Sequence, residues 1–89
     1  MKVLKFGAKW CPGCPIMKPR WKNIEEERPW LKNEMYDYDD DKDIVEKWNV
    51  DERLPTFIFL DKDGNEFHRM HGEYSEAELA KIVDENKDK

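Results

Sequence analysis

Two cysteines separated by two residues are the side chains in this sequence whose type and spacing most clearly suggest a reaction. Cys11 and Cys14 stand in the segment WCPGC, and the chain has no other cysteine. A pair at this spacing can close and open a disulfide, provided that one thiol is ionised near neutral pH, since the thiolate is the nucleophile. The crosslink would close almost no loop, so stabilising the fold is not its purpose. The residues therefore predict thiol-disulfide exchange.

The WCPGC segment lies where a short apolar run gives way to a helical pattern. If Cys11 caps that helix, the free N–H groups of the first turn and the positive end of the helix dipole lower its pKa. Cys14, one turn further in, is then expected to be shielded and to act as the resolving thiol. Pro12 would occupy the first helical position. Pro15 would stand where the helix needs an N–H group, so an irregular first turn is expected.

Metal binding is the main alternative for a lone CxxC segment. A structural zinc site needs four ligands, yet the sequence has no second CxxC. The two histidines, His68 and His71, lie far along the chain on an expected edge strand. A purely structural pair of free thiols is a further alternative, although it would leave the preceding tryptophan and the following helix as coincidences.

Alternating aspartates between Asp37 and Asp43 have the spacing of calcium-loop ligands. A calcium loop that starts at Asp37 needs glycine at its sixth place and glutamate at its twelfth, and these are Lys42 and Trp48. We therefore expect a solvated acidic loop that caps a helix. Asp43 is the expected cap, because Glu46 follows three residues later as in a capping box.

Hydrophobic periodicity predicts the elements that position the cysteines. The expected order is strand, helix, strand, helix, strand, strand, helix. The residues that carry this order are Val3 to Phe6, then Met17, Trp21 and Ile24 in the first helix, Met35 to Tyr38, Ile44 to Trp48, Thr56 to Leu60, Glu66 to Met70, and Leu79, Ile82 and Val83 in the last helix. The turn Asp61 to Gly64 predicts an antiparallel hairpin, and Ser75 with Glu78 predicts a capping box for the last helix.

Length and charge restrict the class of protein. Eighty-nine residues are enough for one core, so residues 1–89 are expected to form a single domain. Charged residues make up 42% of the chain and the net charge is −5, which disfavours nucleic acid as a partner. The N-terminal MKVLKF is too short an apolar run for a signal peptide, and no later run could span a membrane. A cytoplasmic location is therefore expected.

The order of these motifs resembles the thioredoxin family over nearly the whole chain. The similar features are WCPGC after a short strand, Pro19 five residues beyond Cys14, the RLPT segment at 53–56, the DKDG hairpin, Gly72 and the final amphipathic helix. The resemblance implies an α/β, thioredoxin-like fold with a minimal four-stranded mixed sheet flanked by three helices. The expected fold begins at the strand that leads to the cysteines and lacks the additional N-terminal strand and helix of full thioredoxins.

The resemblance also implies roles for individual residues. Cys11 would be the nucleophile and Cys14 the resolving cysteine. The substrate-binding surface would comprise Trp10, Pro12, Gly13, Leu54 and Pro55. Within that set, Pro55 matches the cis-proline that faces the disulfide, and Leu54 matches the residue whose backbone pairs with a substrate peptide. The implied activity is reduction of disulfide-containing proteins by a monomer without a bound cofactor, regenerated by a thioredoxin-reductase-like or other dithiol reductant.

Three departures from the family pattern concern the chemistry of the thiols. Lys5 stands where thioredoxins have a buried aspartate that assists proton transfer, and Met35 stands where the lysine partner of that aspartate is found. One interpretation is that the stem of Lys5 packs beside the sheet while its amine reaches water. The other is that its ammonium lies near the thiols and favours the thiolate. In the motif CPGC, proline directly follows the first cysteine, which is more like glutaredoxins, whereas the thioredoxin motif is CGPC.

Several functional alternatives stay open at the level of sequence. The segment HGEYS at His71 replaces the paired glycines and the aspartate with which glutaredoxins hold glutathione, so glutathione binding is not expected. The protein could run in the opposite direction, as a disulfide oxidant or isomerase, because potentials of related proteins span about −270 to −120 mV. It could also be a non-catalytic binding module.

Overall fold

The computed structural model describes residues 1–89, and its secondary-structure elements follow the predicted order. The strands and helices are β1 (Lys2–Gly7), α1 (Cys14–Glu26), β2 (Lys32–Asp37), α2 (Lys42–Lys47), β3 (Thr56–Leu60), β4 (Glu66–His71) and α3 (Glu76–Glu85).

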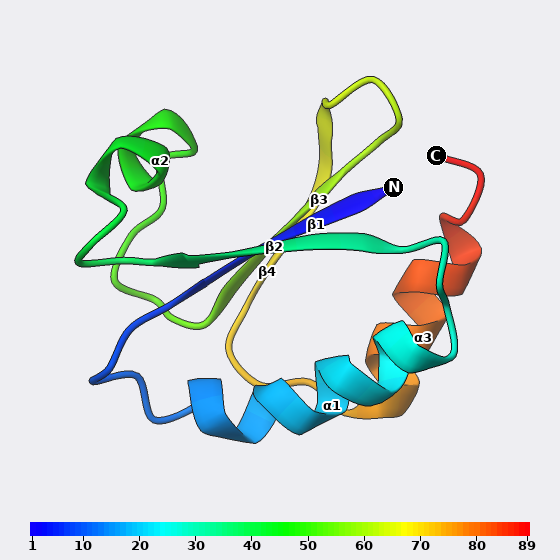
Figure 1. Ribbon diagram of the computed structural model, residues 1–89, viewed down its shortest axis with the longest axis horizontal. Coiled ribbons are helices and arrows are strands. Elements are labelled where there is room, and N and C mark those ends of the chain that lie inside the picture. The colour runs from blue at the N-terminus through cyan, green and yellow to red at the C-terminus, as the bar shows by residue number, and fades with distance from the viewer.

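The four strands form one mixed sheet in the order β2-β1-β3-β4. Strand β1 runs parallel to β2 and antiparallel to β3, and β3 pairs antiparallel with β4. Figure 1 shows α1 and α3 together on one side of the sheet and α2 on the other. The sheet and the three helices confirm the predicted fold class, and they place the start of α1 just beyond the end of β1.

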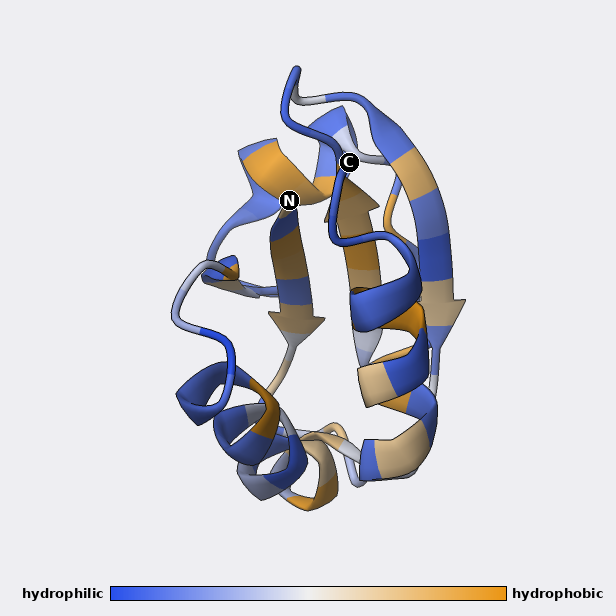
Figure 2. Ribbon diagram, turned by 90° about the vertical axis from the view of Figure 1, so that its right-hand side faces the viewer, coloured by the Kyte–Doolittle hydropathy of each residue, from blue (hydrophilic) through white to orange (hydrophobic).

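The two hydrophobic clusters lie on opposite faces of the sheet, because successive side chains of a strand point to opposite sides. Strand β3 is buried along its whole length. Phe57 and Phe59 contribute to the larger cluster, which they form with α1 and α3, whereas Ile58 and Leu60 contribute to the smaller cluster against α2. Figure 2 shows the hydrophobic residues concentrated in the central strands and the hydrophilic residues along the loops and the C-terminal tail.

The hairpin and the last helix form as the local sequence predicts. The Gly64 N–H group donates to the Asp61 carbonyl at 3.0 Å, and Gly64 has a φ of 84°, a value that glycine adopts without strain. At the start of α3, the Glu78 N–H group donates to the Ser75 hydroxyl at 3.2 Å, and the Glu78 carboxylate accepts from the Ser75 N–H group. The predicted capping box is therefore present.

The acidic loop before α2 differs from the prediction. The N-cap residue of α2 is Asp41, and Asp43 lies inside the first turn. The Asp41 carbonyl accepts from the N–H groups of Ile44 and Val45 at 3.1 and 3.0 Å, so the helix begins two residues earlier than expected. The Asp41 carboxylate does not cap α2 but accepts from the Asp37 N–H group at 2.7 Å, which stabilises the loop.

Strand β2 is longer on its N-terminal side than predicted. It runs from Lys32 to Asp37, so Tyr38 lies outside it. The Tyr38 N–H group still donates to the Gly7 carbonyl at 2.7 Å, which joins the loop after β2 to the end of β1. No helix is both long enough and apolar enough to cross a membrane.

Candidate active site

Cys11 and Cys14 are joined by a disulfide at the junction of β1 and α1. Their Cα atoms are 5.6 Å apart, a separation typical of disulfides. The Cys11 N–H group donates to the Ala8 carbonyl at 3.1 Å, which turns the chain between the strand and the helix. The structure thus places the two predicted cysteines in a closed redox pair.

Helix α1 begins later than the sequence predicts. Its N-cap residue is Gly13, and its first helical bond runs from the Met17 N–H group to the Gly13 carbonyl at 3.1 Å. Pro15 therefore stands in the first turn, where no intrahelical N–H bond is required. The predicted irregularity at Pro15 is wrong for this reason, and Pro12 lies in the loop before the helix instead of at its first position.

The exposure of the two cysteines also differs from the prediction. Cys11 is 3% exposed, whereas Cys14 is partly exposed and lines a pocket beside α1. The prediction that Cys14 is the shielded member is wrong for this oxidised state. The physical reason is the late helix start: Cys11 sits inside the tight turn, and the first turn of α1 carries the side chain of Cys14 toward the pocket.

Gly7, the last residue of β1, lies against the side chain of Cys14. A Cβ atom at this position would lie 2.9 Å from the Cys14 sulfur, closer than real side-chain contacts. Only glycine therefore fits beside the disulfide without a shift of its neighbours.

The segment at Pro55 faces the cysteine loop from the other side. The Leu54–Pro55 peptide bond is cis, as the family resemblance implies. The Pro55 ring lies so close to Gly13 that a Cβ atom there would be 3.0 Å from the Pro55 Cδ atom. The Leu54 N–H group donates to the Glu52 carbonyl at 2.9 Å, while the Leu54 carbonyl has no hydrogen-bond partner in the chain. This carbonyl is thus a free acceptor next to the redox pair.

Trp10 forms part of the surface beside the disulfide. It is 51% exposed, and its indole N–H group donates to the Asp39 carboxylate at 2.9 Å. The ring also packs edge-on against Tyr38, with the centroids 5.9 Å apart. Two contacts from the loop after β2 therefore hold an otherwise exposed aromatic side chain in one orientation.

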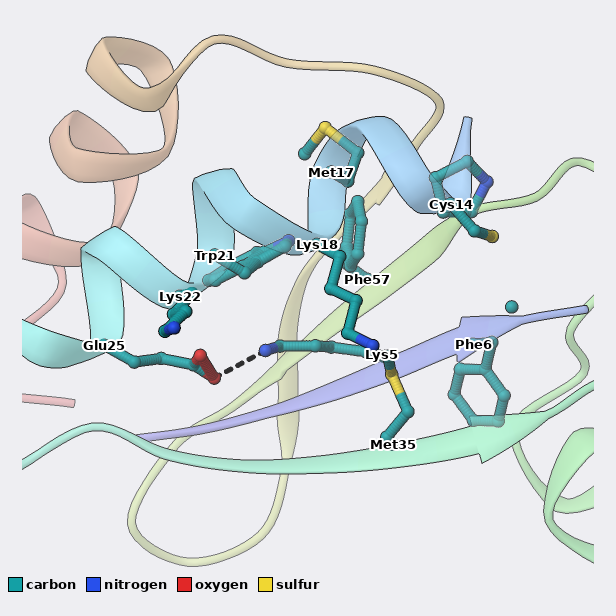
Figure 3. A pocket seen from close by; sticks show the side chains of 12 residues that line it. Lys5, Phe6, Cys14, Met17, Lys18, Trp21, Lys22, Glu25, Met35 and Phe57 are labelled. Carbon is teal, nitrogen blue, oxygen red and sulfur yellow. Dashed lines mark hydrogen bonds and ion pairs between the residues drawn. The ribbon is translucent and has the colours of Figure 1, made fainter. Parts of the chain in front are cut away.

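Lys5 and Cys14 line the same pocket, which has a volume of about 250 Å³. Its walls are largely apolar, and Figure 3 shows the Lys5 amine directed toward Glu25 and away from Cys14. The amine donates to the Glu25 carboxylate at 2.5 Å and lies 4.9 Å from the centroid of the Trp21 ring. Burial lowers the pKa of the Lys5 amine below its usual value, although the hydrogen bond and the charge of Glu25 act in the opposite direction.

The structure gives Lys5 a partner, Glu25, that neither interpretation from the sequence included. Lys5 is only 7% exposed, and its amine is paired with Glu25 inside the pocket. The ammonium also points away from the sulfur atoms, because Glu25 on α1 supplies its partner. Met35, at the position of the missing lysine, is 64% exposed at the rim of this pocket and carries no charge.

The sequence did not predict three polar contacts at the site, which are those of Glu25 with Lys5, Asp39 with Trp10, and His71 with Thr56. The partners are 20, 29 and 15 residues apart, so no local pattern connects them. A weak signal existed for Glu25, because it follows Trp21 by four residues and so shares the buried face of α1. No group of three or more His, Cys, Asp or Glu side chains converges in a way that could hold a metal ion.

A disulfide between CxxC cysteines at the start of a helix, with a proline segment against it, is the arrangement characteristic of thiol-disulfide oxidoreductases. Comparison with known proteins specifies the family. The thioredoxin family model matches residues 1–85. An H-type thioredoxin of Fagopyrum esculentum is 34% identical over 81 residues, which cover 91% of this chain and 68% of that protein. The chain belongs to the thioredoxin family.

Solved structures agree with this assignment. The thioredoxin of Nicotiana alata superposes with a TM-score of 0.85 at 28% identity, over 96% of this chain and 71% of that one. The thioredoxin of Fasciola hepatica gives a TM-score of 0.84 at 29% identity, over 96% of this chain and 79% of that one. An H-type thioredoxin of Oryza sativa subsp. indica, 34% identical over 79% of this chain, is matched over only 56% of its own length. Several relatives are therefore considerably longer than the matched region.

Proposed function

We propose that residues 1–89 act as a single thioredoxin-like domain that reduces disulfides of target proteins, with Cys11 as the nucleophile. The Cys11 thiolate attacks one sulfur of the target disulfide, which forms a mixed disulfide and releases the first target thiolate. The Cys14 thiolate then attacks the Cys11 sulfur and releases the second target thiolate. Two electrons pass to the target, its two thiolates take up protons, and the Cys11–Cys14 disulfide is left.

The observation that carries this proposal is the placement of the disulfide between the start of α1 and cis-Pro55. The disulfide bond holds the Cys11 sulfur beside Cys14, the first residue of α1, where the N–H groups of the first turn favour a negative charge. The same environment would stabilise the thiolate that each step requires. The free carbonyl of Leu54 supports a substrate peptide bound in an extended conformation across Pro55, with Trp10, Pro12 and Gly13 forming the rest of the surface.

Partners and location follow as further parts of the proposal. The Cys11–Cys14 disulfide left by each cycle would be reduced by a separate dithiol reductant, such as a thioredoxin-reductase-like protein, and the domain, with a net charge of −5, would work as a cytoplasmic monomer. The acidic charge opposes binding to nucleic acid.

Insulin reduction tests the activity and the roles of the cysteines. Wild-type protein is expected to reduce insulin with dithiothreitol as electron donor, whereas Cys11→Ser is expected to be inactive. Cys14→Ser should accumulate a mixed disulfide through Cys11, which mass spectrometry identifies. A mixed disulfide that forms only in Cys11→Ser would reverse the two roles, which is a real alternative because Cys14 is the more exposed cysteine in the oxidised state. Equal inactivity of all three proteins would favour a binding module.

Equilibration with glutathione or dithiothreitol buffers tests the direction of electron flow. A potential near the reducing end of the range from about −270 to −120 mV supports a reductase. A potential near the oxidising end would instead support a disulfide oxidant or isomerase.

A further inference from the structure

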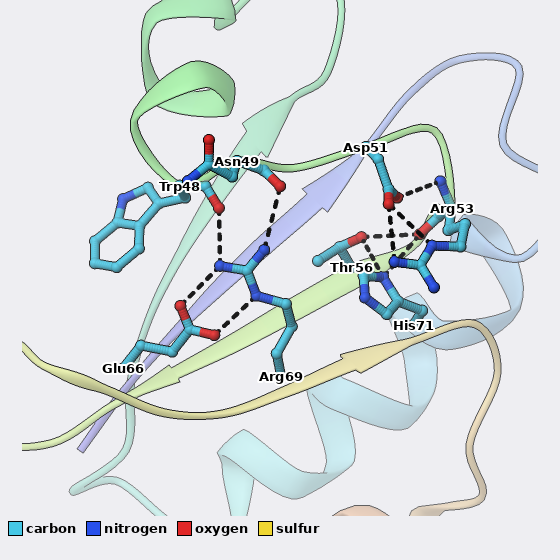
Figure 4. Close-up of polar contacts among 8 residues, drawn as sticks. All are labelled: Trp48, Asn49, Asp51, Arg53, Thr56, Glu66, Arg69 and His71. Atoms are coloured by element: carbon cyan, nitrogen blue, oxygen red, sulfur yellow. Dashed lines mark hydrogen bonds and ion pairs between the residues drawn. The ribbon is translucent and has the colours of Figure 1, made fainter.

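The last residue of β4, His71, packs against the segment that precedes cis-Pro55. Strands β3 and β4 pair Thr56 with His71, and the Gly72 N–H group donates to the Pro55 carbonyl at 2.8 Å. The His71 Nδ1 atom lies 3.1 Å from the Thr56 hydroxyl oxygen and 3.2 Å from the Arg53 carbonyl oxygen. Figure 4 shows these groups around the Arg53 carbonyl. The contacts involve a partly buried histidine that no step of the proposed reaction uses.

The donors and acceptors around the His71 ring indicate which of its two nitrogen atoms carries the proton. Thr56 is fully buried, and its hydroxyl has one proton, which it donates to the Arg53 carbonyl at 2.8 Å. Only lone pairs of the Thr56 oxygen and of the Arg53 carbonyl then face the Nδ1 atom of His71. The Arg53 carbonyl can only accept, and with the Thr56 proton directed at that carbonyl both oxygens within 3.2 Å of Nδ1 offer lone pairs, so this arrangement assigns the ring proton to Nδ1. The Nε2 atom is therefore the unprotonated nitrogen of the neutral ring.

Hydrogen bonds hold the main chain of Arg53 on both sides of its Cα atom, at its N–H group and at its carbonyl. The Asp51 carboxylate accepts from the Arg53 N–H group and from the Arg53 Nε atom, both at 2.9 Å. Thr56 and His71 donate to the carbonyl on the other side. The next carbonyl in the chain is that of Leu54, which has no partner. The orientation of this free acceptor depends on the fixed peptide immediately before it.

We propose that His71 is a positioning residue for substrate binding, which acts by holding the Arg53 carbonyl and thereby aiming the Leu54 carbonyl at a main-chain N–H group of an extended substrate peptide. This inference rests on the proposed reductase function. It assigns His71 no contact with the reacting sulfur atoms. Reduction of a target whose backbone extends across Pro55 should depend on His71, whereas reduction of a small disulfide without such a backbone should not.

The tautomer of His71 can be measured independently of activity. In ¹⁵N-labelled protein, long-range ¹H–¹⁵N correlations at a pH where the ring is neutral distinguish a protonated Nδ1 from a protonated Nε2. The expected result is a proton on Nδ1 of His71, with exposed His68 as the internal comparison. A proton on Nε2 would overturn the inference, because Nδ1 could then donate to neither oxygen.

Kinetics of three variants test the consequence for substrate binding. His71→Leu removes the donor, His71→Asn keeps an amide N–H group near the position of Nδ1, and His71→Gln moves the amide toward the position of Nε2. Loss of one hydrogen bond corresponds to a rise of about 3- to 10-fold in KM for insulin in the Leu and Gln variants, with kcat unchanged. The Asn variant should restore most of the wild-type KM. All four proteins should reduce 5,5′-dithiobis(2-nitrobenzoate) at the same rate.

Each other outcome of these kinetics has a defined meaning. An unchanged KM in His71→Leu, or an equal loss with insulin and with the small disulfide, would refute the positioning role. If His71→Leu does not fold, the comparison between the Asn and Gln variants and the tautomer of the wild-type protein still decide the question. Wild-type protein that reduces neither substrate would instead refute the proposed function, while the tautomer measurement would stand on its own.

Discussion

The Lys5 amine on β1 donates a hydrogen bond of 2.5 Å to the Glu25 carboxylate on α1, inside a pocket that also contains Cys14. The side chains of Lys5 and Glu25 are only 8% and 22% exposed. Removing one partner of such a pair leaves a poorly solvated charge, whereas removing both leaves none. Because the two opposite charges compensate each other, neither is left isolated in the pocket beside the redox site.

Single and double substitutions at this pair are expected to differ in stability. Glu25→Met should lower the free energy of unfolding by about 2 kcal/mol, because it leaves the Lys5 ammonium buried without a partner. The double variant Lys5→Met with Glu25→Met should be more stable than this single variant, since both charges are lost and the pocket walls are apolar. Urea denaturation of the oxidised proteins measures both values.

Lys18 provides the matched control for this experiment. It lines the same pocket, but it is exposed and forms no ion pair. Lys18→Met should change the free energy of unfolding by less than about 0.5 kcal/mol. A double variant that is no more stable than Glu25→Met would contradict the role given to the ion pair.

The lowered pKa of Lys5 predicts a dependence of stability on alkaline pH. In the unfolded chain this amine titrates near 10.5, and in the folded protein it loses its proton at a lower pH. Between the two values the unfolded state binds more protons, so the free energy of unfolding rises with pH, by at most about 1.4 kcal/mol per pH unit. Urea denaturation of the oxidised protein between pH 8 and 11 should show this rise relative to Lys5→Met.

The comparison with Lys5→Met is necessary because Tyr36 acts in the opposite sense. Burial and the nearby Glu34 raise the pKa of the Tyr36 hydroxyl, so its ionisation destabilises the folded protein above pH 10. This contribution is common to both proteins and cancels in the difference. Parallel pH profiles of the two proteins would show that Lys5 titrates as it does in water.

The sequence was sufficient to predict features that depend on neighbours along the chain. The order of the elements and the capping box of Ser75 and Glu78 are both present, whereas the cis bond before Pro55 was expected only from the family resemblance. The predicted start of α1 at Cys11 was wrong. Either Cys11 or Gly13 can precede a helix that contains prolines, and which of them is the N-cap residue depends on how the turn packs. The partner of Lys5 could not be predicted, because it lies 20 residues away on another element.

A surface ion pair joins the segment after α1 to α3, and we expect it to have a small effect on stability at neutral pH. The Arg28 guanidinium donates two hydrogen bonds of 2.8 Å to the Asp84 carboxylate, which is about half exposed. Asp84→Asn should therefore lower the free energy of unfolding at pH 7 by only about 0.5 kcal/mol. Asp88→Asn, in the exposed tail, is the control and should have no measurable effect.

The contribution of Asp84 should disappear in acid. Hydrogen bonds from Arg28 hold the pKa of the Asp84 carboxyl below its usual 3.8. A carboxyl whose pKa is lowered by folding stabilises the protein above its unfolded pKa, and this stabilisation is lost as the pH falls through the folded pKa. Wild type and Asp84→Asn should therefore converge in stability as the pH falls from 3.8 through the folded-state pKa. A difference that persists at pH 2 would assign the effect to packing and not to charge.

The contact between Gly7 and the Cys14 sulfur predicts a change in redox potential. A methyl group at Gly7 would lie 2.9 Å from this sulfur. The disulfide fixes the sulfur in place, whereas a reduced Cys14 side chain can rotate away, so the methyl group should destabilise the oxidised form more than the reduced form. A difference of about 1 kcal/mol would make the potential about 20 mV less negative.

Equilibration of Gly7→Ala and wild type with glutathione buffers measures this shift. Gly13→Ala is the control, because its methyl group would meet Pro55 and Glu73 instead of a sulfur atom. It should therefore affect the binding of protein substrates more than the potential. An unchanged potential in Gly7→Ala would mean that the end of β1 moves to accommodate the methyl group in both redox states, and that Gly7 is not required for the closed disulfide.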